Sequence, residues 1–185
     1  LKMKIKSTKF KGLKIVFSPV HIDNRGFFKE VFKKKLFSKN KFVFTCTSSS
    51  KKNVLRGLHF QKKSAQGKYL NVLKGEIFDV AVDLRKNSKT FGKYFSINLS
   101  DKNGLSIFIP EGFAHGFLGL KKENIICYHC TNYRSKKNES GILWNDKNLK
   151  IKWPINKPIL SSKDKKNLNF NEFLNRNNIK KKVEQ

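Results

Sequence analysis

The stretch EIFDVAVDL, residues 76–84, decides the fold class. Apolar side chains occupy both of its alternating faces, and only Glu76, Asp79 and Asp83 interrupt them. A strand that is apolar on both faces belongs in the interior of a closed or double-layered β-structure. The stretch therefore predicts a central strand whose carboxylates need partners. We expect Asp79 and Asp83 to bind buried donors rather than to act as catalysts.

Short apolar or alternating runs continue on both sides of this stretch, separated by turn-prone pieces such as DNRG, SDKNG and PEG. Helical periodicity is almost missing before residue 160. This pattern predicts an all-β sandwich or barrel, followed by one short helix around Phe170 to Leu174. The predicted strands fall at residues 13–17, 27–32, 42–47, 54–60, 69–73, 76–84, 94–99, 105–110, 116–120 and 125–133.

The chain has the size of one domain and a large excess of positive charge. Its 185 residues include 41 lysines and arginines against 13 acidic residues, a net charge of +28. Such a charge is compatible with nucleic acid, an anionic membrane or a phosphorylated substrate. Because the lysines are scattered in pairs and triplets, we interpret most of them as a solvated surface. A noncatalytic polyanion-binding module remains the alternative from another functional class.

Location is predicted from what the sequence lacks and from its cysteines. No apolar run is long enough to span a membrane, and the lysine-rich start lacks a secretory apolar segment. The cysteines are odd in number, which fits a reducing compartment. We therefore predict a cytoplasmic protein with neither a membrane nor a nucleic-acid partner.

The segment CYHC places Cys127 and Cys130 at a spacing found in redox and zinc sites. It lies within IICYHCTNY, whose β-branched and aromatic content predicts a strand. Residues three apart on a regular strand point to opposite faces. The two thiols are therefore not expected to share a metal.

A second stretch, VLRGLHFQ at residues 54–61, places two groups able to carry positive charge in a run that otherwise resembles a core strand. Arg56 and His59 are three residues apart, so a regular strand would send them to opposite faces. Gly57 lies between them. We predict a local bulge at Gly57 that lets both side chains reach one cavity.

A third stretch, GLSIFIPEGFAHGF at residues 104–117, resembles the second motif of the cupin barrels, in which Pro and Gly form the turn that aims a histidine into the barrel. Here that histidine is His115. Metal-binding cupins also need an HxH pair followed by a Glu. His59 has Gly57 and Gln61 at the corresponding positions, so no metal is expected.

Several motifs together, in order and spacing, resemble the dTDP-4-dehydrorhamnose 3,5-epimerase family from about Phe17 to Asp164. This resemblance implies a cupin-like double-stranded β-helix, a jelly-roll barrel. It implies a single epimerase domain over residues 1–185, with a barrel core at about 13–155 and a C-terminal extension at about 156–185. The motifs are DNRGFF (23–28), NVLRGLHFQ (53–61), QGKYLNVLKGEIFDVAVDLR (66–85), TFG (90–92), IPEGFAHGFL (109–118), the Tyr128 strand, ILWND (142–146), IKWP (151–154) and PILSSKD (158–164).

The resemblance implies roles for individual residues. His59 matches the general base and Tyr128 the general acid on the opposite face of the sugar ring. Lys68 matches the lysine that stabilises the enolate, and Asp164 the carboxylate that orients the base. The substrate-binding positions implied are Arg25, Glu30, Arg56, Lys68, His115, Glu139 and Lys163.

These residue types suit the implied reaction, a cofactor-independent epimerisation of a nucleotide-linked 4-keto-6-deoxy sugar. A base removes the proton beside the ketone, a cation stabilises the developing oxyanion, and an acid returns a proton from the other face. The leading substrate is dTDP-4-dehydro-6-deoxyglucose, epimerised at carbons 3 and 5. The family also implies a homodimer with crossed N-terminal strands, in which Arg25 and Glu30 serve the neighbouring site.

Four positions depart from the family pattern. Phe44, Thr45 and Cys46 replace the usual Gln, Asp and Asn that touch substrate, and Arg134 replaces an aromatic that commonly stacks on the thymine ring. The alternatives that stay open are a different sugar or nucleotide, epimerisation at carbon 3 only, and a 3,4-ketoisomerase. A metal-dependent cupin enzyme is a further alternative.

Overall fold

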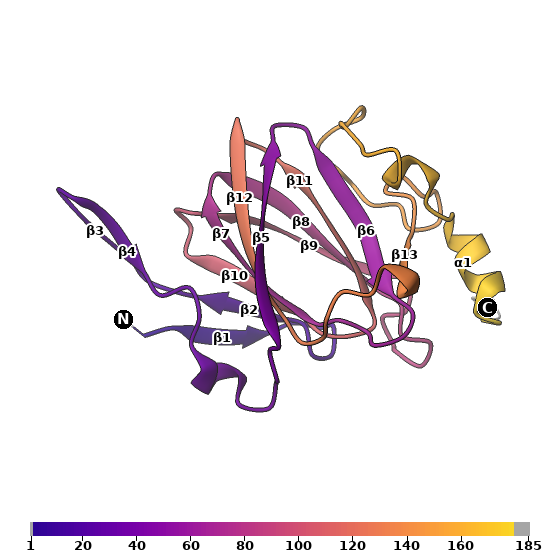
Figure 1. Ribbon diagram of the computed structural model, residues 1–185, viewed down its shortest axis with the longest axis horizontal. Helices are drawn as coiled ribbons and strands as arrows, with labels where there is room; N and C mark the ends of the chain where they lie inside the picture. Colours follow the sequence, from indigo (N-terminus) through magenta and orange to yellow (C-terminus); the bar gives the residue numbers. More distant parts are fainter. Residues whose placement is uncertain (1, 180–185) are drawn as a thin grey trace.

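Two antiparallel sheets face each other in the computed structural model, which describes residues 2–179 (Figure 1). The six-stranded sheet has the order β1 (Lys4–Ser7), β2 (Lys14–Phe17), β10 (Leu105–Ile109), β7 (Lys68–Lys74), β12 (Glu123–Cys130) and β5 (Phe44–Lys51). The five-stranded sheet has the order β13 (Glu139–Gly141), β6 (Leu55–Gln61), β11 (Phe113–Gly119), β8 (Glu76–Asp83) and β9 (Tyr94–Ser100). The prediction of an all-β jelly-roll barrel is confirmed.

Strand β8 lies inside its sheet, between β11 and β9, as its sequence predicts. Its Ile77 and Ala81 point into the main core, while Val80 and Val82 pack on the opposite face in a second cluster. All four are fully buried. Burying a valine or isoleucine side chain stabilises the folded state by about 1.5 to 3 kcal/mol. The side chains on both faces of β8 therefore stabilise the barrel.

The three carboxylates of β8 have partners. Glu76 pairs with Lys121 at 3.3 Å, and Asp79 with His115 at 2.7 Å. Asp83 accepts from Arg85 at 2.7 Å and from the hydroxyls of Ser88 and Thr90. The expectation of a buried donor is confirmed for Asp79, whereas the donors to Asp83 are only partly buried.

The main core fills the space between the two sheets. Leu70, Val72 and Ile126 come from the six-stranded sheet, and Phe113 and Phe117 from the five-stranded sheet. Tyr128 of β12 packs against this cluster. Because side chains alternate along a strand, the residues two positions before and after Tyr128 also lie on the inner face of β12. The inner faces of β5, β6, β7, β11 and β12 therefore surround one interior.

The C-terminal part of the chain covers the outer face of the five-stranded sheet (Figure 1). Its helix α1 (Phe170–Arg176) lies close to the predicted position. Asn169 and Glu172 form a capping box at its start, and Phe173 and Leu174 are buried. Short 3₁₀ turns occur at η1 (Lys34–Phe37), η2 (Lys136–Asn138) and η3 (Asp164–Lys166).

A hairpin formed by β3 (Val20–Asp23) and β4 (Gly26–Lys29) projects away from the barrel (Figure 1). Its large apolar side chains are uncovered: Ile22 is 80% exposed, Phe27 57% and Phe28 67%. The strand predicted at residues 27–32 was therefore too long, because the chain leaves the hairpin after Lys29. Exposed apolar patches of this kind mark contact surfaces.

Other boundaries also differ from the sequence prediction. Strand β11 begins at Phe113, three residues before the predicted start, because the turn ends at Gly112, whose φ is +85°. Strand β12 ends at Cys130 instead of residue 133. Among the described residues, no helix has the length and apolar content to cross a membrane.

Candidate active site

A β-bulge at Gly57 brings Arg56 and His59 to the same face of β6. His59 lies opposite His115 on β11, while Arg56 lies opposite Phe117, so three residues of β6 match two of β11. Gly57 has a φ of +138°, and a Cβ there would lie 2.5 Å from the Cα of Gly116. Only glycine tolerates this conformation and close approach. The predicted bulge is therefore present.

His59 pairs with Asp164 of η3. The distance from His59 Nε2 to Asp164 Oδ1 is 2.5 Å, and the Asp164 side chain is only 4% exposed. Burial alone would raise the pKa of Asp164, but its hydrogen bond and charge interaction with His59 outweigh this and hold the pKa below the usual value. With Nε2 donating to the carboxylate, Nδ1 is left as an acceptor, the form that a general base needs.

Tyr128 comes from the opposite sheet. Its hydroxyl shares a hydrogen bond of 3.0 Å with Ser48 of β5. Burial raises the pKa of Tyr128 well above that of free tyrosine, although the Ser48 hydrogen bond and the charge of Arg56 act in the other direction. The phenol therefore stays protonated at neutral pH and can donate a proton.

Arg56 connects the two sheets of the barrel near Tyr128. It comes from β6 in the five-stranded sheet, yet its Nε donates to Ser50 Oγ at 2.9 Å and its Nη2 to the carbonyl of Ser49 at 3.0 Å. Both serines belong to β5 in the other sheet. Arg56 thereby links the two sheets and places a fixed positive charge near the phenol of Tyr128.

Lys68 begins β7 and pairs with Cys130 of β12, two residues from Tyr128. Cross-strand partners share a face, so the Lys68 amine lies on the inner face with Tyr128. Desolvation lowers the pKa of Lys68, although nearby acidic groups such as Glu139 and Asp79 oppose this shift. A buried amine of this kind gains stabilisation from an anionic ligand placed beside it.

A second histidine–carboxylate pair lies next to the first. His115 Nε2 is 2.7 Å from Asp79 Oδ2, and the side chains are 6% and 0% exposed. The other oxygen, Asp79 Oδ1, is buried and has no hydrogen-bond partner among the described residues. His115 also lines the small inner cavity that His59, Lys68 and Glu139 share.

The outer part of the site is a cavity of about 560 Å³ in front of His59. Glu139 in this cavity is bound by two cations, Arg134 and Lys163. The hydrogen bond from Arg134 is the main cause that lowers the pKa of Glu139 to about 2. The cavity is lined by Val54, Leu55, Arg56, His59, Arg134, Glu139, Ile159, Leu160, Ser161, Lys163 and Asp164.

Two of the predicted site residues lie elsewhere in the single chain. Arg25 is in the turn of the β3–β4 hairpin, with its side chain 85% exposed and paired to Asp23 at 2.6 Å. Glu30 follows the hairpin and pairs with Lys33 at 2.8 Å. Neither residue lines the cavities that contain His59. The other predicted residues converge on the barrel interior and its mouth.

The departures from the family pattern on β5 divide between two faces. Thr45 faces outward, where its hydroxyl lies 2.9 Å from His129 Nδ1. Cys46 pairs with Tyr128 across the strands and so faces inward. Phe44 also faces inward and stacks on Tyr133, with ring centroids 5.9 Å apart and planes within 11°. Two of the three changes therefore lie on the inner face of β5.

The cysteines of CYHC behave as the strand pattern predicts. Cys127 is opposite Asn71 and Cys130 opposite Lys68, so the two thiols point to opposite faces of β12. The cysteines of the chain are free. Within residues 2–179, no three His, Cys, Asp or Glu side chains gather as a metal-binding group.

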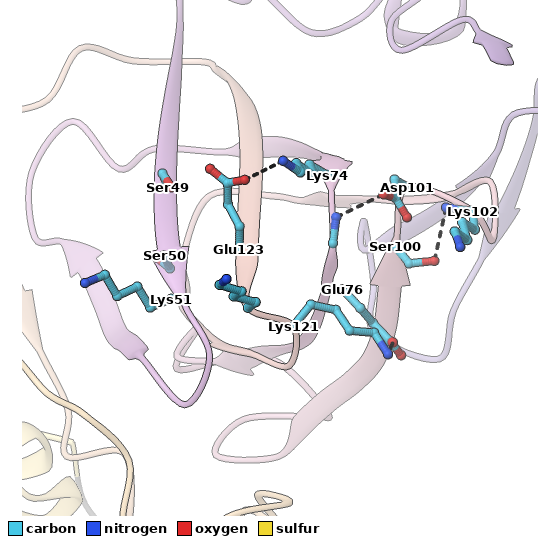
Figure 2. A pocket seen from close by; sticks show the side chains of 12 residues that line it. Ser49, Ser50, Lys51, Lys74, Glu76, Ser100, Asp101, Lys102, Lys121 and Glu123 are labelled. Carbon is cyan, nitrogen blue, oxygen red and sulfur yellow. Dashed lines mark hydrogen bonds and ion pairs between the residues drawn. The ribbon is translucent and has the colours of Figure 1, made fainter. Parts of the chain in front are cut away.

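A larger cavity, of about 810 Å³, lies at the other end of β7 and β12 (Figure 2). Its acidic side chains are already engaged: Glu123 pairs with Lys74 and Glu76 with Lys121, and Asp101 accepts from the backbone of Gly75. None of the residues predicted for catalysis lines it. We therefore identify the cavity around His59 as the candidate active site because of its side chains, although it is the smaller of the two.

A cupin-type barrel that presents a histidine–carboxylate pair, a protonated tyrosine and a lysine to one interior defines an acid–base enzyme. The family model described as dTDP-4-dehydrorhamnose 3,5-epimerase matches residues 7–172 of the chain. The chain belongs to this family, and it is an isomerase that acts on sugar nucleotides. The resemblance found in the sequence is confirmed, and the polyanion-binding alternative is not favoured.

The chain matches known relatives over most of its own length and of theirs. A dTDP-4-dehydrorhamnose 3,5-epimerase of Methanothermobacter thermautotrophicus is 47% identical over 165 residues, which cover 85% of this chain and 89% of the relative. A crystal structure of dTDP-6-deoxy-D-glucose-3,5-epimerase from Legionella pneumophila, in complex with dTDP-4-keto-L-rhamnose, is 41% identical with a TM-score of 0.86 and covers 91% of this chain and 93% of its own. The Bacillus anthracis epimerase structure, with TDP and PPi bound, gives the same identity and TM-score, with 91% and 99% covered.

Sequence reasoning missed two features of the site. Ser48, the hydrogen-bond partner of Tyr128, had only its place two residues after Cys46 to suggest that it faces inward. The ion pair between Arg134 and Glu139 had no local signal beyond opposite charges five residues apart. Both depend on contacts that the strand pattern does not specify.

Proposed function

We propose that the protein epimerises dTDP-4-dehydro-6-deoxyglucose at carbons 3 and 5, giving dTDP-4-dehydrorhamnose, without a cofactor. The observation that carries the proposal is the His59–Asp164 pair on the inner face of the barrel, opposite the sheet that holds Tyr128 and Lys68. The names of the relatives, which include structures with dTDP-linked ligands, support the nucleotide.

His59 is the general base of this proposal. Its Nδ1 takes the proton from the carbon beside the 4-keto group, and its Nε2–H stays bonded to Asp164. The lowered pKa of Asp164 keeps the carboxylate ionised, so it stabilises the imidazolium that forms. A positioned base of this kind contributes about 10²- to 10⁴-fold to the rate.

Lys68 and Tyr128 complete the proton transfer. The ammonium of Lys68 lies beside the ketone oxygen and stabilises the enolate, whose negative charge repays part of the desolvation that lowers the pKa of Lys68. The protonated phenol of Tyr128 then donates to the carbon from the face opposite His59, and Ser48 orients its hydroxyl. Once His59 has released its proton to solvent and Tyr128 has regained one, repeating the sequence at the second carbon inverts both centres.

In this proposal, cations and a second subunit bind the parts of the substrate that lie away from the reacting carbons. Arg56 and Lys163 bind the diphosphate, while His115 and Glu139 contact the rest of the substrate. We place Arg25 and Glu30 in the site of a partner subunit, reached by the exposed β3–β4 hairpin of a homodimer. The apolar side chains of that hairpin would be covered in such a dimer.

The remaining proposals concern the domain, its location in the cell and its oligomeric state. Residues 1–185 would form a single epimerase domain in the cytoplasm, where the free cysteines would remain reduced. Light scattering at working concentration tests the dimer. A monomer that is fully active would contradict the placement of Arg25 and Glu30 in a partner's site.

Proton exchange tests the reaction. The substrate is incubated with enzyme in heavy water, and deuterium at carbons 3 and 5 is followed by NMR. The wild type should label both carbons, whereas Tyr128→Phe should still exchange a proton through His59 but lose turnover to product, because removal and return of the proton are separate steps. Labelling of carbon 3 alone would reduce the function to a 3-epimerase, and no labelling with migration of the keto group would indicate a ketoisomerase.

A further inference from the structure

Arg134 belongs to an ion cluster at the mouth of the active-site cavity that the proton-transfer steps do not use. Its Nε lies 2.5 Å from Glu139 Oε1 and its Nη2 3.1 Å from Oε2. Lys163 Nζ lies 2.6 Å from the same Oε2. Glu139 is 17% exposed, against 60% for Arg134 and 54% for Lys163, so the carboxylate is covered by its two cations.

This cluster decides how much positive charge the mouth offers to an anion. The cavity lining includes Arg56, Arg134 and Lys163, together with Glu139 and Asp164. Asp164 is bound to His59 and is not free to pair with these cations. Glu139 is therefore the acidic group that competes with an incoming anion for Lys163.

The geometry of Arg134 allows Lys163 to leave Glu139. A guanidinium that grips both oxygens of a carboxylate forms a strong, planar, two-bond contact, whereas an ammonium makes a single point contact. Arg134 reaches both oxygens of Glu139, and Lys163 shares only Oε2. When Lys163 turns to another anion, the carboxylate keeps two hydrogen bonds and its charge stays compensated.

We propose that Arg134 is a positioning residue for diphosphate binding: it retains Glu139 while Lys163 exchanges that carboxylate for the diphosphate of the substrate. The inference rests on the proposed nucleotide-linked substrate. Without Arg134, Lys163 would be the remaining partner of Glu139 in the cluster. The diphosphate would then either lose Lys163 to Glu139 or, if Lys163 turned to it, meet an uncompensated carboxylate; each weakens its binding.

The first test is Arg134→Ala, with binding of dTDP and of inorganic diphosphate measured by calorimetry. Both ligands should bind about tenfold more weakly or worse, and the KM should rise by a similar factor. The kcat should stay within about threefold, because His59, Lys68 and Tyr128 are untouched. A matched control is Lys136→Ala, which removes an exposed positive charge two residues away and should change none of these values.

The second test separates positioning from direct contact. Adding Glu139→Gln to Arg134→Ala removes the carboxylate that Arg134 is proposed to neutralise, so diphosphate affinity should recover at least partly. Arg134→Lys should recover less than half of the lost affinity on a logarithmic scale, because an ammonium lacks the two-bond grip. Recovery in the double variant is a result that a general loss of folding would not produce.

Three outcomes would overturn the inference. Unchanged ligand affinity in Arg134→Ala would show that the cluster does not control the anion site. A loss that Glu139→Gln leaves unrepaired would mean that Arg134 touches the ligand itself, and so would full recovery in Arg134→Lys. If the wild type does not bind dTDP, the proposed function fails, while a tenfold effect of Arg134→Ala on the binding of inorganic diphosphate would still support the role of Arg134.

Discussion

Two histidine–carboxylate pairs lie side by side in this barrel, and they differ mainly in exposure. His59 and His115 are direct cross-strand partners on β6 and β11. Their bonds to Asp164 and Asp79 measure 2.5 and 2.7 Å. However, the His59 side chain is 34% exposed and that of His115 only 6%. The same chemical pair therefore occurs once open to the outer cavity and once only at the wall of the inner cavity.

This difference teaches that the pairing of an imidazole with a carboxylate does not by itself make a base. A general base must come within hydrogen-bond reach of the proton that it removes, and it must release that proton again. His59 faces the outer cavity as well as the inner one, whereas His115 faces the inner cavity alone among those described. We therefore assign proton transfer to the first pair and support of the cavity wall to the second.

The largest expected effects come from deleting each histidine in turn. His59→Ala should reduce turnover by about 10²- to 10⁴-fold, and it should cost less stability than loss of His115, because the His59 side chain is 34% exposed and borders the outer cavity, from which water can replace it. His115→Ala should cost about 3 to 5 kcal/mol of unfolding free energy, because it leaves the fully buried Asp79 without its partner. Steady-state rates and urea unfolding of both variants check these values.

The comparison would break if the two variants exchanged behaviour. An active His59→Ala would remove this residue as the base, and a His115→Ala protein with unchanged urea midpoint would show that Asp79 finds another way to be compensated. His59→Gln is a useful companion variant, since it keeps a donor toward Asp164 while removing the base. It should match His59→Ala in rate and the wild type in stability.

A smaller effect, on both activity and stability, is expected from the bulge that separates His59 from Arg56. In Gly57→Ala, the new Cβ would lie 2.5 Å from the Cα of Gly116, in a backbone conformation with φ of +138° that alanine rarely adopts. The strain should cost about 1 to 3 kcal/mol and shift His59 relative to Tyr128, lowering turnover about tenfold or more. Gly26→Ala is the control, since its φ is +132° but nothing lies within 4 Å of a Cβ there. Equal losses in the two variants would mean that backbone strain alone matters.

The smallest predicted effect is a change in acid stability at the exposed pair. The folded-state pKa of Asp164 is lowered, so its ionised form stabilises the protein above its unfolded pKa of about 3.9. That contribution is lost as the pH falls through the lower, folded value. In Asp164→Asn, the stability deficit relative to wild type should therefore be largest near neutral pH and shrink below about pH 4. Urea unfolding at pH 7, 5, 4 and 3 measures it, and a deficit that does not depend on pH would contradict the charge-based pairing.

Much of the fold could be predicted because its signals are local. Alternation of apolar and polar side chains located the strands from β5 to β12 within a few residues, since each strand must bury one face or two. The hairpin strand β3 and the short β1 and β13 were missed. Their side chains bury little, so hydrophobic alternation carries almost no information about them.

For the site, the structure agrees with the predicted position of some residues and not of others. His59, Lys68, Tyr128 and Asp164 were named through a family resemblance, and their placement around one interior agrees with the roles that it implies. Arg25 and Glu30 were named in the same way, yet the single chain leaves both outside the cavity. A sequence motif does not state which copy of the chain a residue serves.

The sequence by itself determined the all-β class, the interior position of β8 and the need for a bulge at Gly57, because each follows from the chemistry of neighbouring residues along one strand. The family resemblance named Asp164 as the partner of His59, but only the tertiary structure brings the two together across 105 residues, and only it shows that Arg134 and Lys163 both bind Glu139. The physical reason is that side-chain direction alternates locally, whereas ion pairs and hydrogen bonds form wherever the packed sheets bring distant groups within about 3 Å.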